Sequence, residues 1–300
     1  MSKEGDAHNT ERLIGLLAAA SELRPELHRY CARLMGSVIE GEDIVQDTLV
    51  RAFVGLEDLD HMPPLRPWLF KIAHNRALDV LRARALRAAE PIEAAFDVAD
   101  SASPDPVEML MRKEAVRTAV SRFAELPIPQ RSVVILKDVL GESLAGIADL
   151  LDLTVDAVKG HLARGRRGLR EINKRAAPPP EAPTPSPQLA RYVALFNQQN
   201  WDALRALLAD DVKLIQSAHP ERAGKADVGM FFSFYAKYDG IRLAPAWLEG
   251  REVIAVFEGG EVEKPSYVMW LEWQGGEIVF IRDYRYVRYA MVDAELVLAP

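Results

Sequence analysis

Cysteine is nearly missing from this sequence, and long apolar runs are missing altogether. Cys31 is the single cysteine, which excludes an intramolecular disulfide and any metal site built from several cysteines. No stretch approaches the roughly 18 consecutive apolar residues that a membrane-spanning helix needs. Residues 1–6 lack the basic start and the apolar segment of a signal peptide. We therefore expect a cytoplasmic protein without a membrane partner, a metal or a cofactor.

The chain also has too few basic residues overall for a nucleic-acid partner to be obvious. Its formal net charge is −7, and a polyanion repels an acidic protein. The charge is uneven, however: residues 1–62 hold 6 basic and 12 acidic side chains, whereas 63–102 and 103–187 have a small basic excess. Within the latter segment, Lys159–Arg175 carries seven basic side chains and one Glu. The middle of the chain can therefore meet a polyanion although the whole chain is acidic.

The 300 residues are enough for two or three domains, and the composition marks the breaks between them. Half of the twelve residues 176–187 are proline, which predicts an extended spacer, and a weaker break rich in Asp, Ser and Pro precedes residue 106. Apolar residues recur with helical spacing before the spacer, and 17 of the 23 aromatic residues follow it. We predict an all-α domain at 8–93, a linker at 94–105, an all-α domain at 106–175, a proline-rich linker at 176–187 and an α+β domain at 188–300.

Residues 143–170 have the pattern of a helix-turn-helix. An apolar face from Leu144 to Leu151 predicts a short helix, Asp152-Leu153 makes a turn, and Thr154 is a natural N-cap for a second, basic helix. Such a pair reads DNA through the first residues of its second helix, while later arginines contact phosphates. An ordinary helical hairpin with a solvated basic face is the alternative.

Three sequence blocks together are similar to one protein family. Leu126-Pro127, Gln130-Arg131 and the helix-turn-helix ending at Arg166 resemble region 4 of bacterial sigma factors. Upstream, residues 42–53 resemble the polymerase-docking helix of sigma region 2, and residues 66–82 resemble its promoter-melting helix. A region 2 block followed by a region 4 block, with a short acidic linker and no third domain between them, resembles the extracytoplasmic-function (ECF) group of the sigma-70 family over about residues 10–175.

The resemblance implies an alternative sigma factor, which is not an enzyme, with core RNA polymerase and promoter DNA as its partners. Exposed side chains at the start of the docking helix and one aromatic would bind polymerase: Glu42, Asp43, Gln46, Asp47 and Phe53. Basic and amide groups would hold the melted downstream promoter element: Lys71, His74, Asn75, Arg76 and Arg82. The duplex upstream element would meet the helix-turn-helix region: Arg131, Thr154, Ala157, Lys159, His161, Arg164, Arg166 and Arg167.

Two further features belong to this interpretation. A loop over residues 58–65 is a weaker candidate for holding a flipped base, and Trp68 is expected to pack in the core. Many relatives have Gly where this chain has Asp152, and Thr-Val-Lys-Ser-Arg where it has residues 157–161. The promoter sequence of a relative therefore cannot be carried over.

The segment after the spacer resembles the SnoaL-like, or ketosteroid-isomerase-like, cone fold, in which a curved sheet surrounds helices and a pocket opens at its mouth. We predict helices at about 188–208 and 227–238 and a hairpin at Gly275-Gly276. Four large side chains are candidate pocket lining for a small apolar molecule, with core packing as the alternative: Trp247, Met269, Trp270 and Phe280. We expect this domain to modulate the activity of the sigma domains.

Two other functions fit parts of the sequence. A stand-alone helix-turn-helix regulator that senses a ligand would protect duplex DNA without polymerase. An enzyme fused to a DNA-binding module would need a carboxylate in its pocket, for which Asp227 and Asp283 are candidates, whereas His219 has a loop context.

Overall fold

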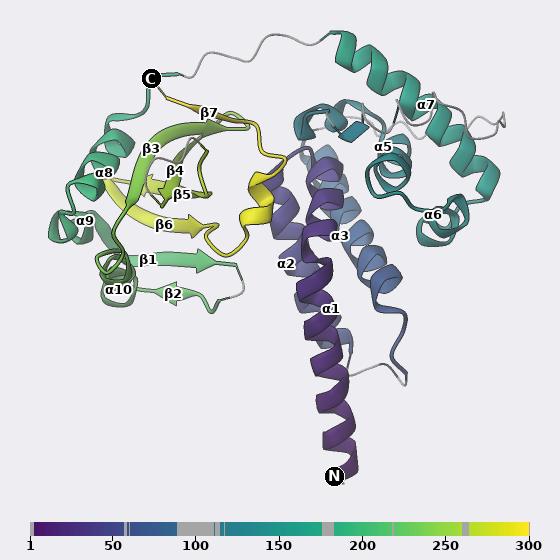
Figure 1. Ribbon diagram of the computed structural model, residues 1–300, viewed down its shortest axis with the longest axis horizontal. Helices are drawn as coiled ribbons and strands as arrows, with labels where there is room; N and C mark the ends of the chain where they lie inside the picture. Colours follow the sequence, from purple (N-terminus) through teal and green to yellow (C-terminus); the bar gives the residue numbers. More distant parts are fainter. Residues whose placement is uncertain are drawn as a thin grey trace. The chain divides into compact units, whose positions relative to one another are not determined.

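The computed structural model describes residues 3–56, 59, 61–88, 111, 115–116, 118–175, 183–217, 219–259 and 264–299 (Figure 1). Contacts divide the chain into two compact units, residues 1–176 and 177–300. The linker predicted at 94–105, the predicted domain start at residue 106 and the first part of the proline-rich linker lie outside the described residues. Among those residues, no helix combines the length and the apolar composition that a membrane span requires.

The first unit is helical, as the sequence predicts. Two of its starts are fixed by side-chain caps: Ser37 accepts a hydrogen bond from the amide of Glu40, and Thr154 accepts one from the amide of Ala157. Its elements are α1 (Lys3–Met35), α2 (Val38–Gly55), α3 (Leu65–Ala88), a 3₁₀ turn η1 (Val120–Glu125), α5 (Ile128–Val134), a π-helical turn η2 (Ile135–Val139), α6 (Leu144–Leu151) and α7 (Val155–Lys174).

The predicted helix-turn-helix is present as α6 and α7. Ser143 caps α6 by accepting a hydrogen bond from the amide of Gly146. Asp152 ends α6 in the left-handed conformation with φ 56°, which turns the chain before Thr154 begins α7. Asp and Asn adopt this conformation more readily than most residues, so Asp152 can make this turn without glycine.

The core of the first unit is continuous from α1 to α7. Buried residues of the first three helices share one hydrophobic cluster with buried residues of η1, α5, η2, α6 and α7. Close helix crossings need glycine: a Cβ on Gly41 would lie 2.5 Å from the Ala32 backbone, and one on Gly165 would lie 2.6 Å from Val134. Trp68 is partly buried against this cluster, in line with the predicted core position. The two sigma-like blocks therefore pack against each other within one unit.

The second unit is an α+β domain, as predicted. Its sheet has the strand order β2-β1-β6-β5-β4-β3-β7, with β1 parallel to β6 and every other pairing antiparallel. Helix α8 packs on β3, and α10 packs on β1. Its elements are α8 (Pro187–Asn197), α9 (Trp201–Ala206), β1 (Leu208–Gln216), β2 (Arg222–Ala223), α10 (Lys225–Tyr235), β3 (Ile241–Leu248), β4 (Arg251–Glu258), β5 (Tyr267–Gln274), β6 (Glu277–Asp283), the 3₁₀ turn η3 (Arg288–Met291) and β7 (Leu296–Leu298).

Two details of this unit test the sequence pattern. The predicted hairpin is confirmed, because Gly275 and Gly276 join β5 to β6 with φ of 60° and 91°. The helical segment predicted at about 188–208 is divided into two helices, α8 and α9. It breaks after Asn197, where Gln199 has φ 55° and Asn200 caps the separate helix α9, and Leu208 already belongs to β1.

Candidate nucleic-acid interface

The exposed start of α7 is the part of the helix-turn-helix that a duplex can reach. Thr154 is exposed, and Ala157 is half-buried behind it. The Lys159 ammonium lies 3.2 Å from the Asp156 carboxylate and keeps about a third of its side chain exposed. Arg164 is half-buried and Arg167 is exposed further along the same helix. These five of the predicted side chains can contact DNA without unfolding α7.

Two other predicted side chains of α7 have roles inside the protein. His161 is 3% exposed, and burial together with the positive charge of Arg164 lowers its pKa. The Arg166 guanidinium makes two hydrogen bonds, of 2.6 and 2.9 Å, to the carboxylate of the buried Asp138. A bidentate pair with a buried carboxylate is strongly held, so Arg166 joins α7 to η2.

The prediction that Arg131 contacts DNA needs correction. Arg131 is 6% exposed, and its guanidinium donates hydrogen bonds of 2.6 Å to the Leu34 carbonyl, 2.5 Å to the Ala124 carbonyl and 2.8 Å to the Leu126 carbonyl. Burial lowers its pKa to about 10. Arg131 thus satisfies backbone acceptors between α1 and η1 and is not available to a phosphate.

The predicted promoter-melting helix, α3, presents four of the predicted side chains at its surface, three of them in ion pairs. Asn75 and Arg82 are exposed, and the Arg82 guanidinium lies 3.8 Å from the Asp79 carboxylate on the same helix. The Arg76 Nε lies 2.7 Å from the Asp47 carboxylate of α2, and the Lys71 ammonium lies 2.6 Å from the Asp152 carboxylate. The side chains of Lys71, Asn75, Arg76 and Arg82 are each more than a quarter exposed. DNA can therefore reach each of them and replace the ion-pair partners of the three cations.

His74, the fifth residue predicted on this helix, faces inward. It is 9% exposed, and its Nδ1 shares a 2.8 Å hydrogen bond with the Tyr30 hydroxyl of α1. Burial and the nearby charges of Lys71 and Arg82 lower its pKa to about 4. A neutral, buried imidazole makes His74 a link between α1 and α3.

The first half of α2 also departs from the prediction at one residue. Glu42 was expected to be exposed but is fully buried, and its carboxylate accepts a 2.5 Å hydrogen bond from Arg24. Asp43 is exposed, whereas Gln46 and Asp47 are half-buried. The burial of Glu42 follows from its position on the side of α2 that packs against α1.

The sequence analysis missed an apolar patch on the same helix. Val50 is 58% exposed, and Phe53 and Val54, three and four residues further along the helix, are 49% and 60% exposed. These residues lie off the buried stripe of Ile44, Thr48 and Ala52, which was the available signal. We give the name α2 face to the exposed and half-buried residues on this side of the helix: Asp43, Gln46, Asp47, Val50, Phe53 and Val54.

The melting helix and the helix-turn-helix contact each other. Besides the pair of Lys71 with Asp152, the Arg66 guanidinium binds Glu142, which precedes α6, and lies 2.6 Å from Glu26 of α1. In this arrangement the Lys71 ammonium binds the carboxylate of Asp152, which lies in the turn before α7. Both side chains keep part of their surface exposed, 38% for Lys71 and 78% for Asp152.

The four residues predicted to line a pocket in the second unit do not line the cavity that the structure describes there. Met269 is fully buried. Trp270 packs edge-on against Phe280 with ring centroids 5.9 Å apart, and the Trp247 Nε1 donates a 3.1 Å hydrogen bond to the Pro183 carbonyl. Met269 therefore packs in the core, and the three aromatic side chains are half-buried outside the cavity lining.

Comparison with known families matches both helical blocks. The family described as Sigma-70 region 2 matches residues 20–87, and the family described as Sigma-70, region 4 matches residues 116–169. The matched segments contain α2 and α3 in the first case and the helix-turn-helix in the second.

Curated relatives carry the same description. The chain is 33% identical over 219 residues to the ECF RNA polymerase sigma factor SigG of Mycobacterium tuberculosis, across 65% of this chain and 59% of that protein. It is 36% identical over 138 residues to the RNA polymerase sigma factor CnrH of Cupriavidus metallidurans, across 44% of this chain and 72% of that one. The chain thus spans less than two thirds of SigG.

One solved structure is similar to part of the chain. The putative ketosteroid isomerase from Kribbella flavida is 24% identical, with a TM-score of 0.27, and the match covers 32% of this chain and 73% of that one.

Proposed function

The chain belongs to the ECF group of RNA polymerase sigma factors, and we propose that it binds core RNA polymerase, recognises and melts specific promoters, and so initiates transcription at them. The observation that carries the proposal is the joint presence, within one unit, of the α2 face and the exposed start of α7. An alternative sigma factor acts where polymerase transcribes the chromosome, which for this chain is the cytoplasm.

The α2 face is the proposed contact with polymerase. Its carboxylates, at Asp43 and Asp47, suit a basic coiled coil and steer docking, while Phe53 with Val50 and Val54 supplies apolar area. Exposed aromatic anchors of this kind carry much of the binding energy of an interface.

The DNA contacts are proposed for the side chains that solvent can reach. Lys71, Asn75, Arg76 and Arg82 of α3 would hold the melted element, because a single strand is bound by cations and by hydrogen-bonding groups beside its bases. On α7, Thr154 and Ala157 would meet base edges, and the cations would meet phosphates: Lys159, Arg164 and Arg167.

Binding to polymerase and promoter DNA would loosen the contact between α3 and α6. The pairs of Lys71 with Asp152 and Arg66 with Glu142 join the two DNA-contacting elements, and exposed ion pairs of the first kind contribute little stability. The pair of Lys71 with Asp152 can therefore be exchanged for a contact with promoter DNA at small cost.

We also propose that residues 188–300 form a domain that adjusts sigma activity. It follows a proline-rich spacer, which permits a tethered domain to act on its neighbour at high effective concentration. A chain that ends at Arg175 should then initiate at the same promoters with a changed output.

Substitution of Phe53 tests the polymerase contact. Phe53→Ala removes the exposed aromatic of the α2 face, and we expect affinity for purified core polymerase to fall at least about tenfold, as for an interface anchor. Fluorescence anisotropy of the labelled full chain, titrated with core enzyme, measures the dissociation constant.

The matched control is Leu86→Ala, because Leu86 is an exposed apolar residue of α3 outside the α2 face. It should leave the affinity unchanged. Equal affinities for wild type and Phe53→Ala would contradict the role of the α2 face, and equal losses in both variants would show a general effect of exposed apolar area.

A further inference from the structure

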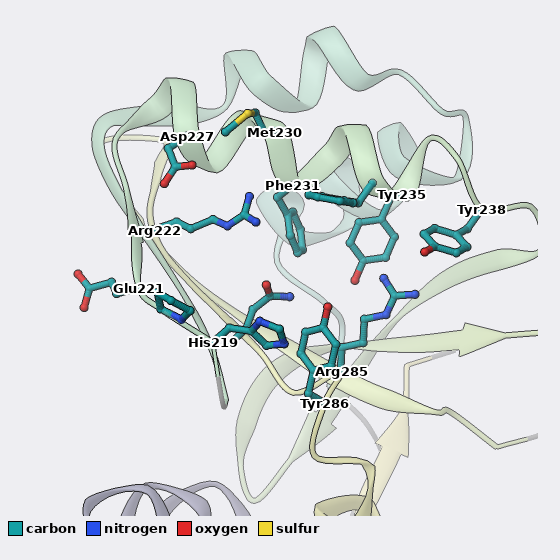
Figure 2. Close-up of a pocket in the computed structure, with 13 residues that line it drawn as sticks. His219, Glu221, Arg222, Asp227, Met230, Phe231, Tyr235, Tyr238, Arg285 and Tyr286 are labelled. Carbon is teal, nitrogen blue, oxygen red and sulfur yellow. The ribbon is translucent and has the colours of Figure 1, made fainter. Parts of the chain in front are cut away.

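The second unit contains a cavity of about 680 Å³, lined from α10, from the end of β1 and the segment that follows it, and from the residues after β6 (Figure 2). Its volume lies in the range of sites for small molecules. Three aromatic side chains of α10 form one wall: Phe231, Phe234 and Tyr235. Tyr238 and Tyr286, both exposed, complete the rim. Planar rings on several sides suit a flat, unsaturated ligand.

Two polar side chains of the cavity lining, Gln216 and Tyr235, are hydrogen-bonded to buried groups of the sheet. The Gln216 Nε2 donates a 2.7 Å hydrogen bond to the buried Asp283 carboxylate, and the Tyr235 hydroxyl shares a 2.7 Å hydrogen bond with the Tyr267 hydroxyl. Tyr235 also lies 3.5 Å from the same Asp283 carboxylate. Because their partners are buried, the side chains of Gln216 and Tyr235 face the cavity in fixed orientations.

Two arginines give the cavity its charge. Arg285 lies 5.4 and 5.1 Å from the ring centroids of Tyr235 and Tyr238, and it is paired with Glu258 at 3.1 Å. Arg222 lies 5.5 Å from the Phe234 centroid, and no ion pair of Arg222 is found among the residues that the structure describes. Figure 2 shows the Arg222 guanidinium directed into the cavity beside Phe231.

The lining also contains two acidic groups, Glu221 and Asp227. Glu221 forms an ion pair with Lys213 at 3.3 Å, and Figure 2 shows its carboxylate turned away from the cavity. Asp227, on the first turn of α10, also lines the cavity and contributes one negative charge there. Because Arg285 is paired with Glu258, Arg222 is the arginine of the lining that we expect an anionic ligand to engage.

We propose that this cavity binds a small aromatic carboxylate, with its ring against Phe231 and Phe234 and its carboxylate on the Arg222 guanidinium. A guanidinium presents paired N–H donors that match a carboxylate, and stacking on an aromatic side chain orients that donor plane. The ligand class differs from the apolar molecule expected from sequence, because Arg222 and Arg285 lie in the cavity and the predicted tryptophans do not. The proposal is independent of the sigma activity.

Calorimetric titration of the full chain with 2-naphthoate tests this site. We expect one molecule of 2-naphthoate to bind per chain, and Arg222→Gln to weaken binding at least about tenfold, since a charge-assisted pair is lost. The matched control is Arg242→Gln: Arg242 is an exposed arginine of β3 that also stacks on a ring, Phe257, at 4.1 Å, but lies outside the cavity lining. Arg242→Gln should bind 2-naphthoate as tightly as wild type does, and both variants should keep the wild-type melting temperature.

The neutral analogue 2-naphthamide separates charge recognition from burial of the ring. Wild type should bind it at least about tenfold more weakly than 2-naphthoate, and Arg222→Gln should bind it as wild type does. Absence of 2-naphthoate binding at millimolar concentration would overturn the site. Equal affinities for the two compounds, or equal losses in Arg222→Gln and Arg242→Gln, would overturn recognition of the anion by Arg222.

Discussion

At the scale of single residues, helix periodicity indicates which face a side chain occupies but not what lies across from it. Glu42, Arg131 and His74 are polar residues of the kinds that bind partners, and each is buried against another element instead. The acceptor of the Arg131 guanidinium at Leu34 is 97 residues away in the chain, so no local pattern could reveal it. By contrast, Thr154 was predictable as a cap, because a cap bonds only its own helix.

Asp283 gives a prediction at this scale. Its carboxyl is fully buried, and burial raises its pKa to about 6 from the 3.8 of an ordinary Asp. The folded domain therefore binds this proton more tightly than the unfolded chain does. Ionised Asp283 destabilises the fold above about pH 6, and that cost disappears as the pH falls towards 4. At about 1.4 kcal/mol per pKa unit, it amounts to roughly 3 kcal/mol.

Asp283→Asn removes the ionisation, so the stability of wild type relative to this variant should rise by up to about 3 kcal/mol between pH 7 and pH 4. Denaturant unfolding followed by tryptophan fluorescence measures it, because four of the five tryptophans lie in the second unit. Asp202→Asn, at a 98% exposed carboxylate of the same unit, controls for the loss of one charge. If the difference in unfolding free energy between wild type and Asp283→Asn does not change with pH, the raised pKa of Asp283 is contradicted.

At the scale of elements, those with local signals were predictable and those set by long-range pairing were not. The helix-turn-helix and the Gly275-Gly276 hairpin follow from caps, turns and periodicity within a few residues. The helical segment expected at about 188–208 is divided because the chain turns at Gln199, and it ends before Leu208, which enters a strand that pairs with β6 in parallel. That pairing joins Leu208 to Ile278, far along the chain.

The crossing of α5 and α7 gives the prediction at this scale. A Cβ on Gly165 would lie 2.6 Å from the Val134 side chain and 3.0 Å from the Gln130 carbonyl oxygen, so Gly165→Ala forces the two helices apart. Overpacking of this kind costs about 1–3 kcal/mol. Chemical unfolding followed by far-ultraviolet circular dichroism should show that loss of stability in the first unit.

Gly168→Ala is the matched control on the same helix. Its closest contact would be the end of the Leu126 side chain, at 2.7 Å, which can rotate away. Alanine is also favoured over glycine inside a helix by about 1 kcal/mol. We expect Gly168→Ala to be close to neutral. A Gly165→Ala variant as stable as Gly168→Ala would mean that the α5–α7 crossing is looser than the structure shows.

At the scale of the whole molecule, composition indicated the two fold classes and the boundary between them, but not which side chains meet in the candidate nucleic-acid interface. Proline content marked the spacer, and the concentration of aromatics after it marked the second fold class. The net charge of −7 conceals a basic segment, Lys159–Arg175, which contains most of the helix-turn-helix cations. What composition could not show is that α3 and α6 contact each other in the first unit, because that contact joins segments from separate sequence blocks.

Transcription by purified core RNA polymerase tests the central claim most directly. Fragmented genomic DNA from the source bacterium is transcribed with core enzyme alone and with core enzyme plus the full chain, and the 5′ ends of the transcripts are sequenced. A sigma factor should add a discrete set of start sites that share two upstream sequence elements and that disappear when the chain is omitted. The same start sites and yields with and without the chain would contradict the assignment.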